Sequence, residues 1–296
     1  MQNFYHASGT AARSGWQVQL DDTEAGWSYT GVKVGQFDKA ESFSLPADNW
    51  ERAIWPLSGD GILVEYLGSA PGAKELRGRK SVFHGPADFL FLPRNTAAKI
   101  TGSGRFIVAE AKAKADATVQ FTAKEDVEVT LRGAGPASRQ VHDYGGVNFL
   151  NASAMIVVEV IVPSGNHSGV PPHKHDTFDL GVESNLEEIY YFELAPDRNQ
   201  ATPEASDPIG YFRAYPSDDR MISEAREIRS GDVCLVPFGF HGPVSAIPPY
   251  DLYFMNVMAG PDPERTWNIV DDPNHSWARK TWENLAPDSR LPYLAD

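Results

Sequence analysis

A chain of 296 residues is long enough for one large domain or for two domains of roughly 150 residues. Its 40 acidic and 26 basic residues give a formal net charge of −14, which disfavours binding to nucleic acid or to an anionic membrane surface. The single cysteine excludes an internal disulfide and a cysteine-cluster metal site, and no apolar run approaches the roughly 20 residues of a membrane span. We therefore expect a cytoplasmic protein without a signal peptide.

The segments between the Gly and Pro residues are short and rich in β-branched and aromatic residues, a pattern typical of strands. In chain order, the predicted strands are Ala53–Leu57, Ile62–Leu67, Phe89–Leu92, Arg105–Ala109, Met155–Val162, Glu188–Leu194, Val233–Val236 and Leu252–Met258. The turn signals SGDG (58–61), PGAK (71–74), GSGR (102–105) and PSGN (163–166) lie between them. Only 223–229 and the stretch near 277–285 are predicted to be short helices. Many short strands separated by turns predict an all-β sandwich or barrel architecture.

One internal match suggests a duplication. ADFLFLPRNTA (Ala87–Ala97) and GDVCLVPFGFH (Gly231–His241) both carry Asp in second place, then four apolar residues and Pro, at an offset of 144 residues. This predicts two copies of one β unit, residues 1–135 and 136–296, with a junction in GAGPAS (133–138). The alternative is that two apolar strands before a proline match by chance.

The residues able to bind a metal gather in the second half of the chain. His173 and His175 are two residues apart in PPHKHD, so in an extended strand both imidazoles project to the same side. Glu188 opens an apolar aromatic strand, and His241 ends the PFGFH turn. Three imidazoles and one carboxylate suit a divalent ion such as Zn, Mn, Fe or Ni. Taken singly, each histidine also has an ordinary explanation, as a solvated or packed side chain.

The His-x-His pair, the Glu before a hydrophobic strand, and the G-x5-P-x-G sequence followed by His resemble the two motifs of the cupin superfamily. Longer stretches resemble the 5-deoxy-glucuronate isomerase family of bacterial myo-inositol breakdown. They cover most of residues 139–277 and are RQVHDY, VVEV, PSGNHSGVPPHKHD, LEEIYYF, RSGDVCLVPFGFH, YDLYFMNVMAGP and DDPNHSW. The resemblance implies two cupin-type β-barrel (jelly-roll) domains with metal in the second only, and Ala97 indeed stands where His241 would be.

The resemblance also implies an activity, the metal-dependent aldose–ketose isomerisation of 5-deoxy-D-glucuronate to 5-dehydro-2-deoxy-D-gluconate through a metal-stabilised enediolate. One divalent ion is expected, Zn or Mn first and Fe or Ni as further possibilities, bound by His173, His175, Glu188 and His241. Glu187 points to the opposite face of its strand, where we expect it to be solvated or a structural partner.

The remaining site residues are less determined. Asp176 and Tyr253 are candidates for the base that moves the C2 proton, although Asp also suits a turn and Tyr also suits a core. Arg139 is a candidate for the substrate carboxylate, with an interdomain ion pair as the alternative. Lys174, which we expect to point away from the metal, and Tyr190, on the inward face with Glu188, complete the substrate-binding candidates.

Two other functions use the same ligands. Three His and one Glu also hold Fe(II) in cupin dioxygenases, and a cupin barrel can serve as a non-catalytic sugar-binding module. The expected partner is a small uronate, without nucleic acid or membrane, and a homo-oligomer is left open.

Overall fold

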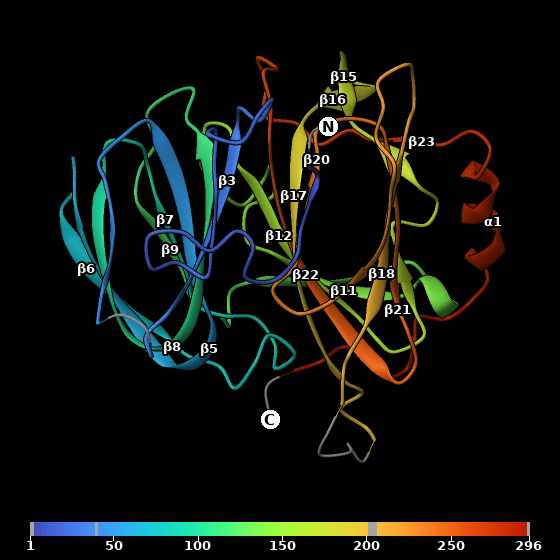
Figure 1. Cartoon of the computed structure of the whole chain (residues 1–296), viewed down its shortest axis with the longest axis horizontal. Helices are drawn as coiled ribbons and strands as arrows, with labels where there is room; N and C mark the ends of the chain where they lie inside the picture. Colours follow the sequence, from blue (N-terminus) through green and yellow to red (C-terminus); the bar gives the residue numbers. More distant parts are fainter. Residues whose placement is uncertain (1–2, 39–40, 201–205, 295–296) are drawn as a thin grey trace.

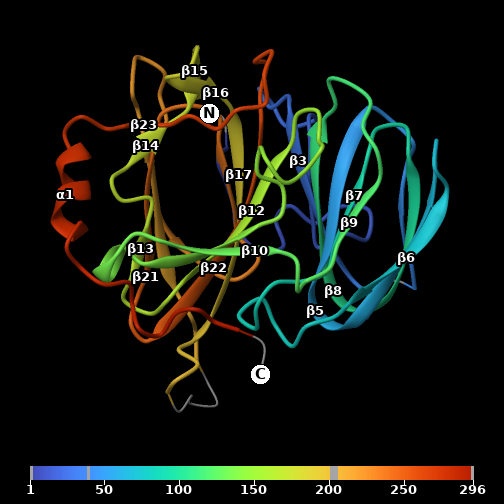
Figure 2. The same ribbon diagram turned by 180° about the vertical axis from the view of Figure 1, so that it is seen from behind.

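The computed structural model describes residues 3–38, 41–200 and 206–294. Two β-rich bodies lie side by side along the long axis of the molecule (Figures 1 and 2). The first, in the blue-to-green part of the colour bar, is built on an eight-stranded antiparallel sheet. Its strands are β2 (Val18–Leu20), β3 (Thr30–Gln36), β4 (Phe43–Leu45), β5 (Trp50–Leu67), β6 (Gly72–Arg77), β7 (Phe89–Leu92), β8 (Ala97–Lys112) and β9 (Gln120–Thr122).

The second body consists of two facing sheets and a hairpin. The seven-stranded sheet runs in the order β1 (Tyr5–His6), β20 (Val233–Val236), β17 (Glu187–Pro196), β22 (Tyr250–Ala259), β12 (Ile156–Val162), β11 (Arg139–Asp143) and β10 (Glu128–Arg132). The opposite sheet contains β19 (Glu224–Ile228), β18 (Gly210–Tyr215), β21 (Phe240–Ala246), β14 (His173–Lys174) and β23 (Val270–Asp271), with β13 (His167–Ser168) beside β21. The hairpin is β15 (Asp176–Asp179) and β16 (Glu183–Asn185).

Helices are few and short, namely η1 (Gly135–Ala137), η2 (Ser276–Ala278) and α1 (Arg279–Trp282). The predicted all-β fold is confirmed, and so is the short helix within 277–285. In the part of the chain that the structure describes, no helix has the length and apolar character needed to cross a bilayer.

The register of the two bodies supports the predicted repeat. In the first, β7 pairs with β5 so that Arg52 lies opposite Leu92; in the second, β20 pairs with β17 so that Glu188 lies opposite Val236. Leu92 and Val236 are 144 residues apart, and each directly precedes the proline of its motif. The boundary between 1–135 and 136–296 stays a prediction. Two strands of the first range, β1 and β10, are hydrogen-bonded into the seven-stranded sheet of the second body.

Two local predictions are wrong. The segment 223–229 is not a helix, because β19 pairs along its length with β18, and that pairing outweighs the helix propensity of Glu, Ala and Arg. The sequences SGDG and GSGR are not turns between strands, since β5 and β8 continue through them and pair there. The ladder shifts register at this point, and a Cβ on Gly59 would lie 2.7 Å from the Cα of Gly104. The glycines let the two paired strands approach closely where the ladder shifts register.

Candidate metal centre

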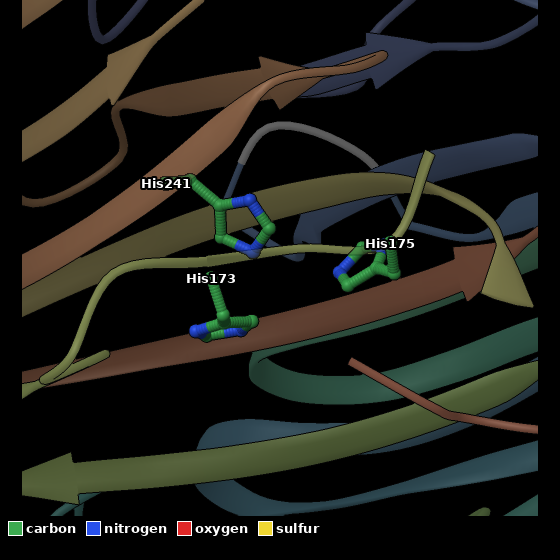
Figure 3. Close-up of side chains that lie close together, drawn as sticks. All are labelled: His173, His175 and His241. Atoms are coloured by element: carbon green, nitrogen blue, oxygen red, sulfur yellow. The ribbon is translucent and has the colours of Figure 1, made fainter. Parts of the chain in front are cut away.

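Three imidazoles converge between the two sheets of the second body (Figure 3). His173 lies on β14 directly opposite His241 on β21, and His175 follows one residue after β14. The ring centroids of His173 and His175 lie 4.5 Å and 4.9 Å from that of His241. One nitrogen from each ring falls within 4.8 Å of the others, so the three side chains are able to hold one metal ion.

The carboxylate of Glu188 completes the cluster from the facing sheet. Its Oε2 lies 3.0 Å from Nε2 of His175 and 3.1 Å from Nε2 of His241. His175, Glu188 and His241 are each no more than 2% exposed. The backbone carbonyl of Leu186 lies 3.1 Å from Nδ1 of His175, which suits an Nδ1–H donor and leaves Nε2 facing the carboxylate.

The electrostatics of this cluster suit a cation. Burial works to raise the pKa of Glu188, but His175 and His241 outweigh it and hold that pKa well below its usual range. Burial, together with His241 and His175, lowers the pKa of His173 and favours the neutral imidazole that ligates metals. Nε2 of His241 is buried 3.1 Å from Oε2 of Glu188 and, among the described residues, has no hydrogen bond of good geometry. An unpartnered ring nitrogen beside an ionised carboxylate fits a divalent ion.

The cluster opens into a cavity with apolar and cationic walls. Its inner part is lined by His173, Glu188, Tyr190, Phe254 and Asn256, together with Arg132, Arg139 and Trp267. Burial, followed by the Glu188 charge, raises the pKa of Tyr190 well above its ordinary value, so its hydroxyl stays protonated at neutral pH. The adjoining outer cavity, about 360 Å³ in volume, shares His173, Arg132 and Arg139.

Arg139, the candidate for the substrate carboxylate, lies in the cavity wall. It lines both cavities and donates to the carbonyl of Ala137 over 3.2 Å. Burial, aided by the charges of Arg132 and Arg279, lowers the pKa of Arg139 to about 10. Among the described residues it has no carboxylate partner. The alternative, an interdomain ion pair, is not present among the described residues.

Asp176 and Lys174 belong to a structural network beside the cluster. Lys174 donates to Asp176 and Glu183 at 2.7–2.8 Å, which agrees with its expected direction away from the metal. The other carboxylate oxygen of Asp176 accepts bonds from the amide of Gly239 and the guanidinium of Arg220, both at 2.8 Å. Burial works to raise the pKa of Asp176, but these donors hold it well below its usual range. The contacts of Asp176 tie the chain directly after His175 to the turn before His241.

Tyr253 is not brought to the histidines. On β22 it lies opposite Ile161 and Glu193, and so on the face away from Glu188, whose partner is Met258. Its hydroxyl donates to Glu159 over 2.6 Å, between the two bodies. Glu187 faces the same way and accepts hydrogen bonds from the amides of Tyr29 and Thr30, both at 2.6 Å. This agrees with the expectation that Glu187 is a structural partner.

Comparison with known proteins agrees with this arrangement. A model of the KduI/IolB family matches residues 4–278. The chain belongs to this family. Its relatives include a 5-deoxy-glucuronate isomerase of Geobacillus thermodenitrificans, which is 33% identical over 294 residues, or 95% of this chain and 97% of that protein.

Solved structures give the same result for this KduI/IolB-family chain. The crystal structure of an IolB-like protein from Salmonella typhimurium LT2 has a TM-score of 0.78 and 31% identity, and the match covers 93% of this chain and 98% of that one. The oxalate decarboxylase of Lactobacillus farciminis shares only the fold, with a TM-score of 0.55 and 9% identity over 92% and 89% of the two chains. The resemblance read from the sequence is confirmed.

Sequence reasoning about this family member missed Arg132, Asn256 and Trp267, which line the inner cavity. Asn256 had a usable signal, because Tyr190 was placed on the inward face and Asn256 is its cross-strand partner. Arg132 and Trp267 had none. They reach the cavity because β10 and the loop after β22 form part of its wall.

Proposed function

We propose that this chain is a 5-deoxy-glucuronate isomerase that converts 5-deoxy-D-glucuronate to 5-dehydro-2-deoxy-D-gluconate. The observation that carries the proposal is that one cavity holds both a metal-type cluster, His173 with Glu188, and the cation Arg139. The substrate has the matching features, a carbonyl with a neighbouring hydroxyl at one end and a carboxylate at the other. The family relatives that bear this name span nearly the whole chain.

His173, His175, Glu188 and His241 would hold one divalent ion, for which we propose Zn or Mn. Such an ion supplies Lewis acidity, which makes the C–H next to a carbonyl more acidic. Arg139 binds the far carboxylate with its planar guanidinium and sets the direction in which the sugar enters. Phe254 and Trp267 exclude water from one wall.

Tyr190 takes the remaining polar role. Outside the proposed metal ligands and the arginines, it is the titratable side chain that lines the cavity. Its hydroxyl is protonated at neutral pH and interacts with Glu188 and Asn256, and it would donate to a substrate oxygen once a metal ion engages Glu188. Asp176 and Tyr253 hold the surrounding structure, since their oxygens already have protein partners.

The activity is tested by incubating the metal-loaded protein with 5-deoxy-D-glucuronate and following the ketose product by NMR. We expect turnover without oxygen consumption, as befits a cytoplasmic enzyme of sugar breakdown. Oxygen uptake with a diol or flavonol would indicate a dioxygenase instead. Binding of the uronate without any product would indicate a sugar-binding cupin.

The polar roles are tested by Tyr190→Phe, Asp176→Asn and Tyr253→Phe. Tyr190→Phe is expected to lower kcat by about 10²-fold with the metal content unchanged. Tyr253→Phe, on the far face, should keep kcat within a few-fold and lower only stability. A loss of kcat confined to Tyr253→Phe or Asp176→Asn would restore that residue as the base.

A further inference from the structure

The mouth of the cavity carries more positive charge than one carboxylate contact requires. Arg132, Arg139 and Arg279 line the outer cavity, and none of its other lining residues is acidic. The acidic residue of the inner cavity is Glu188, which the metal cluster engages. This cationic mouth belongs to a chain with a net charge of −14.

Two of these arginines oppose each other directly. Arg132 on β10 and Arg139 on β11 are partners in the antiparallel ladder. Residues directly opposite in such a ladder project from the same face with Cβ atoms about 5 Å apart, and like charges there are destabilising. Among the described residues neither guanidinium has an acidic partner, whereas Arg279 is paired with Asp271. An anion bound between the two guanidiniums would remove this energetic cost.

The local structure holds both guanidiniums at the cavity. That of Arg132 lies 5.6 Å from the ring centroid of Trp267, a stacking distance that fixes its direction. Gly133 leaves room for its neighbour, since a Cβ there would lie 2.8 Å from Nη1 of Arg139. The positive φ of +71° at Gly133 turns the chain directly after Arg132.

We propose that Arg132 is a specificity-determining residue that binds the substrate carboxylate together with Arg139. The anion lies between the two guanidiniums and neutralises a pair that is repulsive in its absence. Sugars that end in a carboxylate are accepted, and the corresponding sugars without one are rejected. This inference rests on the proposed function for its substrate, but the anion site is testable separately.

The test compares wild type with Arg132→Gln and with Arg213→Gln. Arg213 is the matched control, because it also stacks on an aromatic ring, 3.9 Å from the centroid of Tyr215, and lines neither cavity. For 5-deoxy-D-glucuronate, Arg132→Gln should lower kcat/KM about 30- to 1,000-fold, mainly through KM. For 5-deoxy-D-glucose, which lacks the carboxylate, kcat/KM should already be low in wild type and should not change in Arg132→Gln. An equal loss for both sugars would overturn the proposal.

Binding gives a second readout that does not depend on turnover. D-gluconate should raise the Tm of wild type and of Arg213→Gln, and D-glucitol should not. Arg132→Gln should have a Tm at or above wild type without ligand, because a repulsion is removed, and should lose most of the gluconate shift. A lower Tm with an undiminished gluconate shift would overturn the proposal and make Arg132 a structural residue.

The two readouts separate the two claims. If wild type turns over neither sugar while Arg132→Gln still loses the gluconate shift, the anion site stands and the isomerase fails. If wild type is an isomerase and Arg132→Gln changes neither kcat/KM nor the gluconate shift, the isomerase stands and the role of Arg132 fails.

Discussion

The two bodies of the molecule place different side chains at the same position. In the second body, Glu188 on β17 faces His175 and His241 from the seven-stranded sheet. In the first body, the equivalent register on β5 holds Arg52, whose guanidinium is paired with Glu110 and Asp48 at 2.7 Å. At this position the first body satisfies its buried charge internally, whereas the second presents ligand atoms that a metal ion would satisfy.

The residues next to these positions, in contrast, make equivalent contacts between the two bodies. Glu51, next to Arg52, accepts the amides of Ala154 and Met155 across the interface at 2.8 and 2.6 Å. Glu187, next to Glu188, accepts amides of the first body in return. The two bodies thus make reciprocal interface contacts and differ in their interiors, and the residues proposed as metal ligands belong to the second body.

The largest expected effect is on the interior of the second body. His241→Ala should remove the bound metal and lower turnover by more than about 10³-fold, because one of the four proposed metal ligands is lost and alanine cannot replace it. Elemental analysis and the isomerase assay measure both on the same sample. His167→Ala is the matched control, since His167 contacts Ser245 instead of the cluster and should keep metal and activity. Retention of metal and turnover in His241→Ala would remove His241 from the ligand set.

The interior of the first body should respond in stability instead of activity. Among the described residues, Arg52→Ala leaves Glu110 paired with Lys33 alone, and we expect a loss of about 3 kcal/mol in the free energy of unfolding. The metal content per folded chain should stay unchanged. Arg229→Ala, on the surface with two exposed acidic partners, should cost no more than about 1 kcal/mol. Loss of metal in Arg52→Ala would mean that the first body also contributes to the metal site.

The contact between the bodies should be sensitive to acid. Glu159 is fully buried and accepts bonds from Arg79, Trp55 and Tyr253. Its burial works to raise its pKa, but the charge of Arg79 and the bond with His142 outweigh this and hold the pKa well below its usual range. The stabilisation is therefore complete above the unfolded-state pKa of about 4.3 and is lost as the pH falls toward the folded-state pKa.

Glu159→Gln should cost about 3 kcal/mol at pH 7, because Arg79 is left uncompensated. Denaturant unfolding of both proteins between about pH 7 and pH 3 should show the difference shrinking as the pH falls. A difference that stays constant over this range would show that the carboxylate charge is not what joins the bodies.

The smallest expected effects are those of the reciprocal contacts. Glu51→Gln and Glu187→Gln should each cost about 1–2 kcal/mol of unfolding free energy, since a neutral amide still accepts some of the same bonds but more weakly. Similar values for the two would sharpen the equivalence of the interface positions. A large loss for one and none for the other would break it.

Sequence alone predicted the strand pattern, because alternation is a local signal, and the resemblance to cupin motifs supplied the four residues proposed as metal ligands. It failed where partners distant in the chain decide the outcome. The sequences SGDG and GSGR are typical of turns, but in the structure they lie within β5 and β8, which pair with each other there. Tyr253 looks like a site residue until its register places it opposite Ile161, and Arg132 had no signal before β10 was seen to pair with β11.

The most direct test of the central claim is a titration of metal-stripped protein with Zn²⁺ or Mn²⁺, with isomerase activity on 5-deoxy-D-glucuronate measured at each step. If the second body alone holds a catalytic metal, activity should be absent at the start and rise linearly to a plateau at one equivalent per chain. Full activity in the stripped protein, or a plateau at two equivalents, would contradict the account.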